Sequence, residues 1–166
     1  MDTQKYTVLF VCAHNSVRSI LAESLLNEMG GPHFKAYSAG SDPTGQVHPF
    51  ALELLAEHGL PTAGLRSKSW DEFAGLNAPT LDFVITVCDK VSGERRPLWP
   101  GHTITADWHI EAPRVCGQTD ESARIAIAHV FRLLTQRINA FLSLPLSHYD
   151  HLSLHPHADA RAHDAN

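Results

Sequence analysis

The sequence predicts an α/β protein: a four-stranded parallel sheet with helices on both faces, in a single domain. Short apolar runs of strand length alternate along the chain with longer stretches that carry apolar residues at helical spacing. Such alternation is typical of parallel sheets with right-handed crossovers. The length of 166 residues, 43% of them hydrophobic, suits one domain with a substantial core.

The first half of the chain alternates two expected strands with two expected helices. Residues 6–11 form an apolar run typical of a buried parallel strand, and residues 34–38 alternate in polarity. Residues 16–29 and 49–58 show helical periodicity, each followed by glycine, and Pro49 suits a first turn. The expected inward residues are Val17, Ile20, Leu21, Leu25 and Met29 in the first helix, and Leu52, Leu55 and Ala56 in the second.

The second half contains the strongest signals for both kinds of element. Residues 81–88 are the most strand-like run, residues 70–73 suit a short helix, and residues 102–106 suit a fourth strand. Residues 119–144 predict a long helix, capped by Thr119, whose inward stripe is Ile127, Val130, Leu134, Ile138 and Phe141. From residue 145 the composition becomes rich in His, Asp and Ala, so we expect a domain over 1–144 and a flexible tail over 145–166.

Composition argues against several classes of function. The net charge is −5 and no Lys/Arg cluster stands out, which argues against nucleic-acid binding. No stretch approaches the roughly 20 apolar residues of a membrane span, and no basic-then-apolar leader is present, so we expect no membrane contact and a cytoplasmic location. Three cysteines, Cys12, Cys88 and Cys116, fit neither a disulfide framework nor a zinc template, so we expect free thiols and no metal.

The segment from Cys12 to Arg18 lies where the first strand turns into the first helix. Such a turn directs backbone N–H groups into one concavity above the positive end of the helix dipole, which suits a tetrahedral oxyanion. Arg18 can close over the anion, and the same field favours Cys12 as the nucleophilic thiolate. We therefore expect a cysteine nucleophile beneath an oxyanion bound by Ala13, His14, Asn15, Ser16, Val17, Arg18 and Ser19.

A second thiol is expected beside the first. Cys88 ends the third expected strand, as Cys12 ends the first. Sites in open parallel sheets lie outside the carboxyl ends of the strands, so we expect the two cysteines to share one crevice. Free cysteines at strand ends are also common as inert core residues, which is the alternative for Cys88.

Six stretches together resemble the thiol-dependent arsenate reductases of the low-molecular-weight protein tyrosine phosphatase fold. The resemblance implies that Cys12 attacks arsenate held by the loop and Arg18, and that Asn15 and Ser19 shape the loop. It also implies that Cys88 then attacks Cys12, releases arsenite and leaves a Cys12–Cys88 disulfide. No bound cofactor is expected. An external thiol reductant, a glutathione/glutaredoxin-like system or thioredoxin, would restore the enzyme. The stretches are residues 12–19, 38–41, 67–73, 84–89, 97–101 and 106–108.

Two positions depart from the family pattern. Arg96 stands just before a proline, where three-cysteine members have their third thiol. The resemblance therefore does not imply that this chain has their internal disulfide relay. Cys116 replaces that thiol only if its loop folds over the site. Ala112 stands where the fold usually has an acidic residue before a proline. Glu111 is our choice for the general acid, with Asp107 and His109 as alternatives.

Two other functions remain open from the sequence. A low-molecular-weight phosphatase acting through a Cys12 phosphocysteine would use the same loop, although the acid before Pro113 is missing. A non-enzymatic sensor would use the loop only to bind an oxyanion, although such a protein needs neither a nucleophile nor a second thiol. Glu23, on the first helix, is expected either at the surface or as a hydrogen-bond partner under the loop.

Overall fold

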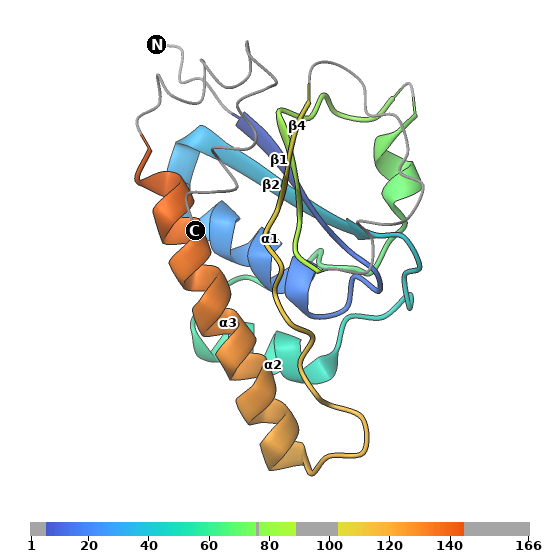
Figure 1. Cartoon of the computed structure of the whole chain (residues 1–166), viewed down its shortest axis with the longest axis vertical. Coiled ribbons are helices and arrows are strands. Elements are labelled where there is room, and N and C mark those ends of the chain that lie inside the picture. Colours follow the sequence, from blue (N-terminus) through green and yellow to red (C-terminus); the bar gives the residue numbers. More distant parts are fainter. Residues whose placement is uncertain (1–5, 76, 89–102, 145–166) are drawn as a thin grey trace.

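A four-stranded parallel sheet forms the centre of the molecule (Figure 1). The computed structural model describes residues 6–75, 77–88 and 103–144. The strand order is β2-β1-β3-β4, and all three strand pairs are parallel, which confirms the predicted sheet. The strands are β1 (Tyr6–Cys12), β2 (Phe34–Gly40), β3 (Phe83–Thr86) and β4 (Ile104–Asp107).

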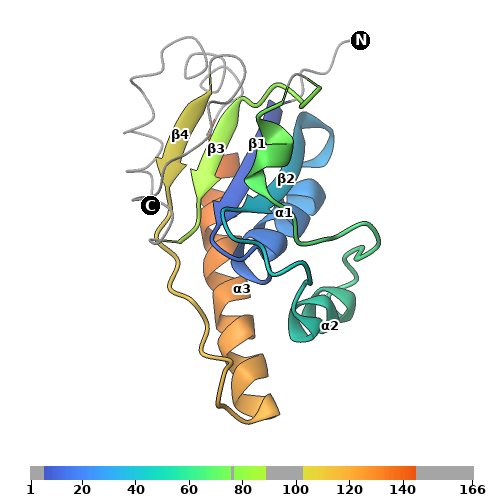
Figure 2. The same cartoon turned by 90° about the vertical axis from the view of Figure 1, so that its right-hand side faces the viewer.

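Helical elements lie on both faces of this sheet. Helices α1 (Arg18–Met29) and α3 (Asp120–Leu142) pack together, and Phe141 of α3 lies 5.5 Å, ring to ring, from Phe34 of β2. On β2, Tyr37 points to the opposite face and contacts Phe73, ring to ring, at 5.4 Å. Phe73 belongs to the short 3-10 helix η2 (Trp70–Phe73), which Figure 2 shows in green in front of the sheet, with α3 behind it. The remaining helical elements are α2 (Pro49–Glu57), beside α1 and α3, and η1 (Gly31–His33).

Most element boundaries follow the sequence signals, and the long helix follows them best. All five residues of the predicted stripe on α3 are buried, and the Oγ1 of Thr119 accepts a hydrogen bond from the N–H of Ser122 at 3.1 Å. The 3-10 helix η2 has the expected bounds. The third strand is shorter than expected, because β3 covers only Phe83–Thr86 of residues 81–88. The expected tail over 145–166 lies outside the described residues.

Two predictions about the helices are wrong in detail. Helix α1 begins at Arg18 rather than at Ser16, because the carbonyl of Ser16 accepts a hydrogen bond from the N–H of His48 at 3.0 Å and belongs to the preceding loop. In α2, Ala56 is exposed and Ala51 is buried in its place. This short helix packs against α1 and α3 along a stripe that begins one residue earlier than the pattern suggested, at Ala51 rather than Leu52. In the part of the chain that the structure describes, no helix combines the length and apolarity needed to cross a membrane.

The sheet places both expected thiols at the same edge. Strand β1 ends at Cys12, and β3 ends at Thr86, two residues before Cys88. The strands remain paired at this point, since the N–H of Val87 donates to the carbonyl of Val11 at 2.8 Å. The crevice predicted outside the carboxyl ends of the strands therefore begins between these two chain segments.

Candidate active site

The loop between β1 and α1 turns its carbonyl groups away from the crevice. The carbonyls of Cys12, Ala13, His14 and Ser16 accept hydrogen bonds from backbone N–H groups of residues 41–48, at 2.8 to 3.2 Å. Across a trans peptide, the N–H of the next residue points opposite to the carbonyl. The N–H groups of residues 13, 14, 15 and 17 therefore point away from the 41–48 segment, which is the arrangement that an anion-binding loop requires.

Asn15 is the central bracing residue of the loop. Its side chain is fully buried, and its φ of 50° lies in the left-handed region, where Asn is better tolerated than most residues. The Oδ1 atom accepts from the backbone N–H of Lys68 at 2.8 Å, and Nδ2 donates to the Oγ of Ser19 at 2.7 Å. Because a backbone N–H can only donate, Lys68 determines which end of the amide faces Ser19.

This amide orientation determines the role of Ser19 toward the nucleophile. The Oγ of Ser19 lies 3.0 Å from the Sγ of Cys12 and already accepts a hydrogen from Asn15. Its own hydroxyl hydrogen is therefore free to be donated to the sulfur. A hydrogen bond donated to a thiolate stabilises the charged form. This hydrogen-bond relay from Lys68 through Asn15 and Ser19 therefore ends at the sulfur of Cys12, which is itself only 2% exposed.

Gly40 lets the end of β2 approach the loop closely. A Cβ atom built at this position would lie 2.5 Å from the carbonyl oxygen of Ala13 and 3.0 Å from the Cβ of Asn15. The N–H of Gly40 donates to the carbonyl of Lys68 at 2.9 Å, so the glycine also anchors the 67–69 segment. This close contact depends on tertiary packing, so no local signal in the sequence reveals it.

Arg18 and Cys88 border the crevice beyond the loop. A pocket of about 510 Å³ is lined by Ala13, His14, Arg18, Cys88, His109, Ile110, Glu111 and Ala112. A smaller adjoining pocket, of about 130 Å³, is lined by Cys12 and shares His14, Arg18 and Ala112 with the first. The Nη1 of Arg18 donates to the carbonyl of Ile110 at 2.9 Å. The guanidinium thus links the nucleophile loop to the segment after β4.

The two thiols are unpaired and both are buried. Cys12 and Cys88 each line one of the two adjoining pockets that share Arg18. The third thiol, Cys116, is exposed and lines neither pocket, although its neighbour Val115 borders the smaller one. The structure therefore brings together the expected pair of thiols and leaves Cys116 outside it. Arg96 lies outside the described residues.

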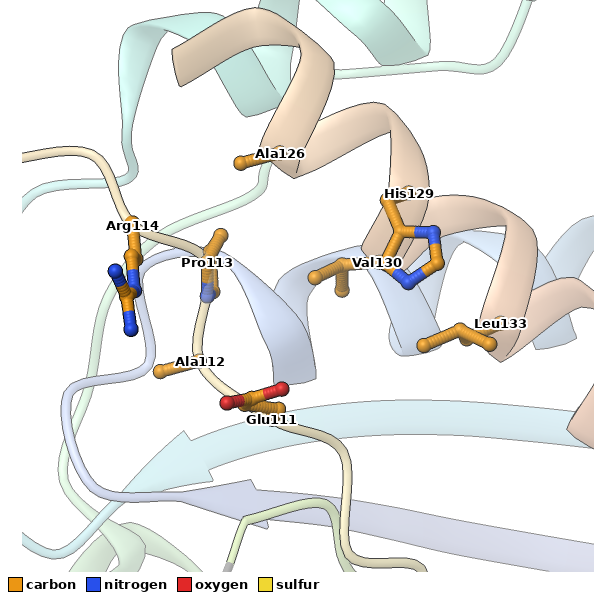
Figure 3. A pocket seen from close by; sticks show the side chains of 8 residues that line it. All are labelled: Glu111, Ala112, Pro113, Arg114, Ala126, His129, Val130 and Leu133. Atoms are coloured by element: carbon orange, nitrogen blue, oxygen red, sulfur yellow. The ribbon is translucent and has the colours of Figure 1, made fainter. Parts of the chain in front are cut away.

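Among the three candidates for the general acid, two line the larger pocket. Glu111 and His109 border it together with Arg18, whereas Asp107 of β4 does not. Glu111 is exposed and also borders a neighbouring pocket of about 280 Å³, shown in Figure 3 between residues 111–114 and helix α3. Its carboxylate therefore lies at the junction of the two openings, where a proton can reach it from solvent.

A largely buried ion pair, between Glu23 and Lys68, lies beneath the loop and was only partly foreseen. The carboxylate of Glu23, on α1, accepts a hydrogen bond from the Oγ of Ser38 at 2.5 Å, so of the two alternatives for this residue the hydrogen-bonded one holds. Its Oε1 lies 3.9 Å from the Nζ of Lys68, which is only 7% exposed. Burial raises the pKa of the Glu23 carboxyl and lowers the pKa of the Lys68 ammonium. Lys68 was part of a matching stretch, but no spacing rule pointed to its ammonium.

The fold and this site together define a class of cysteine-dependent enzymes that bind an oxyanion in a strand-to-helix loop. The profile of the low molecular weight phosphotyrosine protein phosphatases matches residues 7–149, and the chain belongs to this family. The match covers all the residues of the loop and the two thiols of the crevice.

Within the family, the chain is similar to arsenate reductases. It is 33% identical over 106 residues to the glutaredoxin arsenate reductase of Synechocystis sp., covering 64% of this chain and 77% of that protein. The crystal structure of arsenate reductase from Archaeoglobus fulgidus matches with 32% identity and a TM-score of 0.58, over 80% of this chain and 98% of that one. The thioredoxin-dependent arsenate reductase of Corynebacterium glutamicum matches with 28% identity and a TM-score of 0.55, over 84% and 64% of the two chains.

Proposed function

We propose that the protein is an arsenate reductase that uses Cys12 as its nucleophile and Cys88 as its second redox thiol. The observation that carries this proposal is the placement of both thiols on adjoining pockets that share Arg18. Hydrolysis of a phosphate ester requires only the first thiol. Reduction of arsenic(V) requires two thiols in all, because two electrons must pass to arsenic, and Cys88 can supply the second one within the chain.

The first step is attack of the Cys12 thiolate on arsenate. The S–As bond forms as one arsenate oxygen leaves, protonated to water. Arg18 and the loop N–H groups stabilise the charge on the remaining oxygens, since they are held in place before the reaction. We assign Glu111 as the proton donor to the leaving oxygen, because its carboxyl borders the pocket that holds Arg18.

The second step transfers the electrons. The Cys88 thiolate attacks the sulfur of Cys12 and forms the S–S bond as the S–As bond breaks. The electron pair of that bond remains on arsenic, which leaves as arsenite, and the two cysteines lose two electrons together. Pairing of strands β1 and β3 immediately before the two residues supports their closeness.

The third step restores the thiols through an external reductant. A dithiol protein or glutathione reduces the Cys12–Cys88 disulfide by thiol–disulfide exchange. The names of two relatives, one with glutaredoxin and one with thioredoxin, support a reductant of this kind. We assign the protein to the cytoplasm because its thiols must be kept reduced between turnovers.

The test is arsenite release by the purified full-length protein with arsenate, separately with a glutathione/glutaredoxin system and with thioredoxin. We expect turnover with at least one of them, none for Cys12→Ser, and a single thiol–arsenic adduct without turnover for Cys88→Ser. Mass spectrometry after one turnover without reductant should show a Cys12–Cys88 bond. Hydrolysis of an aryl phosphate that survives Cys88→Ser, with no arsenite from the wild type, would instead identify a phosphatase.

A further inference from the structure

The ion pair between Glu23 and Lys68 lies close to the nucleophile but has no role in the steps above. Glu23 follows Ser19 by four residues on α1, so their side chains lie one helical turn apart on the same face. Ser19 is the residue whose hydroxyl contacts the Cys12 sulfur. A carboxylate at this position opposes a negative charge on the sulfur unless another group balances it.

Lys68 is placed to balance that carboxylate and to hold the loop at the same time. Its ammonium group lies 3.9 Å from the Oε1 of Glu23 and donates to the carbonyl of Arg66 at 3.1 Å. Its backbone N–H orients Asn15, and its carbonyl accepts from Gly40. One residue therefore contacts the hydrogen-bond relay through its backbone and the largely buried carboxylate through its side chain.

We propose that Lys68 is a positioning residue whose buried charge balances Glu23 beneath the loop and so keeps Cys12 in its reactive thiolate form. Only the consequence for turnover rests on the proposed arsenate reduction. The reactivity of Cys12 toward an alkylating reagent is a separate property of the chain. The effect of Lys68 on Cys12 can therefore be tested without arsenate.

Other charged groups around the pair are more exposed. Lys35 on β2 is exposed and lies over the Tyr37 ring, and Arg66 is paired with Glu72 of η2 at the surface, at 2.7 Å. Exposed charges are screened by water and salt, whereas a buried pair is screened much less. On the crevice side, the charged or titratable groups that line the pocket with Cys12 are His14, Arg18 and His48.

The pair gives the two single substitutions opposite effects. Lys68→Met leaves the Glu23 carboxylate unbalanced, which disfavours a thiolate on Cys12. Glu23→Gln leaves the Lys68 ammonium unbalanced, which favours it. An unbalanced charge in a partly buried setting, one helical turn from the residue that contacts the sulfur, shifts the titration of the thiol by about one pH unit. A residue that acted only by supporting the fold would move both variants in the same direction.

The experiment measures the rate of Cys12 alkylation by iodoacetamide against pH in the full-length protein, followed by mass spectrometry of the Cys12 peptide. The midpoint of this profile should rise by about one pH unit in Lys68→Met and fall by about as much in Glu23→Gln. It should return near the wild-type value in the double variant and in Lys68→Arg. The matched control is Lys35→Met, which removes an exposed lysine that also interacts electrostatically with Glu23 and should leave the midpoint unchanged.

Shifts of the same sign in the two single variants, or no shift in either, would overturn the proposal. If Lys68→Met does not fold, the downward shift in Glu23→Gln and its cancellation in the double variant decide the question, and the absence of either refutes it. Because no arsenate or reductant is present, a protein that fails to reduce arsenate can still show these shifts. Failure of this inference and failure of the proposed function are therefore distinguishable.

Discussion

The loop over residues 12–19 and the segment over residues 109–118 border the same crevice but are held very differently. The loop is buried and braced on several sides, by the side chain of Asn15, by Gly40 and by backbone hydrogen bonds from residues 41–48. The other segment has no helix or strand and is largely exposed, and Arg18 ties it to the loop at Ile110. A part that stabilises charge has to be rigid, whereas the exposed segment has fewer contacts and can adapt.

The largest expected effect comes from removing the brace of the loop. Asn15→Ala should lower kcat/KM for arsenate by about a hundredfold or more, since losing oriented hydrogen bonds at a charge-stabilising site has costs of this order. The value of kcat/KM, measured by steady-state kinetics, and the rate of Cys12 alkylation should both fall. Asn27→Ala is the matched control, because Asn27 also uses both ends of its amide, on the backbone of Ala36 far from the crevice. It should lower stability while leaving alkylation of Cys12 unchanged.

A second substitution tests the close approach of β2 to the same loop. Gly40→Ala should lower the free energy of unfolding by about 2 kcal/mol, because its Cβ would meet the Ala13 carbonyl in a packed region. Urea denaturation measures this loss. Gly75→Ala provides the control, since a Cβ there meets no atom within 4 Å. Equal stability of the two variants would show that the loop shifts readily to accommodate a Cβ atom, and would contradict the rigidity assigned to it.

A smaller effect is expected for the acid on the adaptable segment. Glu111→Gln should lower the rate of adduct formation by about tenfold, less than is common for a general acid, because the oxygen leaving arsenate is an undemanding leaving group. Single-turnover measurements separate this step from disulfide reduction, which should be unaffected. The control is His109→Gln, at the other candidate lining the pocket. A larger loss in His109→Gln than in Glu111→Gln would transfer the role to the histidine.

The smallest effect is expected at the exposed thiol. Cys116→Ser should leave turnover with an external reductant within about twofold of the wild type, the scatter expected at a surface position away from the chemistry. Its side chain is exposed and lines neither pocket of the crevice. Loss of turnover in this variant, together with a Cys88–Cys116 bond in the wild-type protein after one cycle, would show that the adaptable segment carries a disulfide relay.

Most of the fold was predictable because its signals are local. Periodicity located the stripe of α3, glycine and proline marked helix ends, and apolar runs located the strands. The start of α1 was misplaced because Ser16 and Val17 suit a helix locally, yet hydrogen bonding to the 41–48 segment holds Ser16 in the loop. Ala56 was misplaced because the direction of a short stripe depends on what packs against it.

The sequence by itself determined the class of fold, the loop with its nucleophile and its arginine, and the expectation of a second thiol at a neighbouring strand end. The class of fold follows from periodicity along the chain. The loop and the second thiol follow from residue order next to Cys12 and Cys88, where spacing and backbone geometry are directly linked. Only the tertiary structure decided that Lys68 orients Asn15, that Gly40 touches the loop and that Cys116 stays outside the crevice. Those contacts join residues far apart in the chain, and packing rather than local propensity selects them.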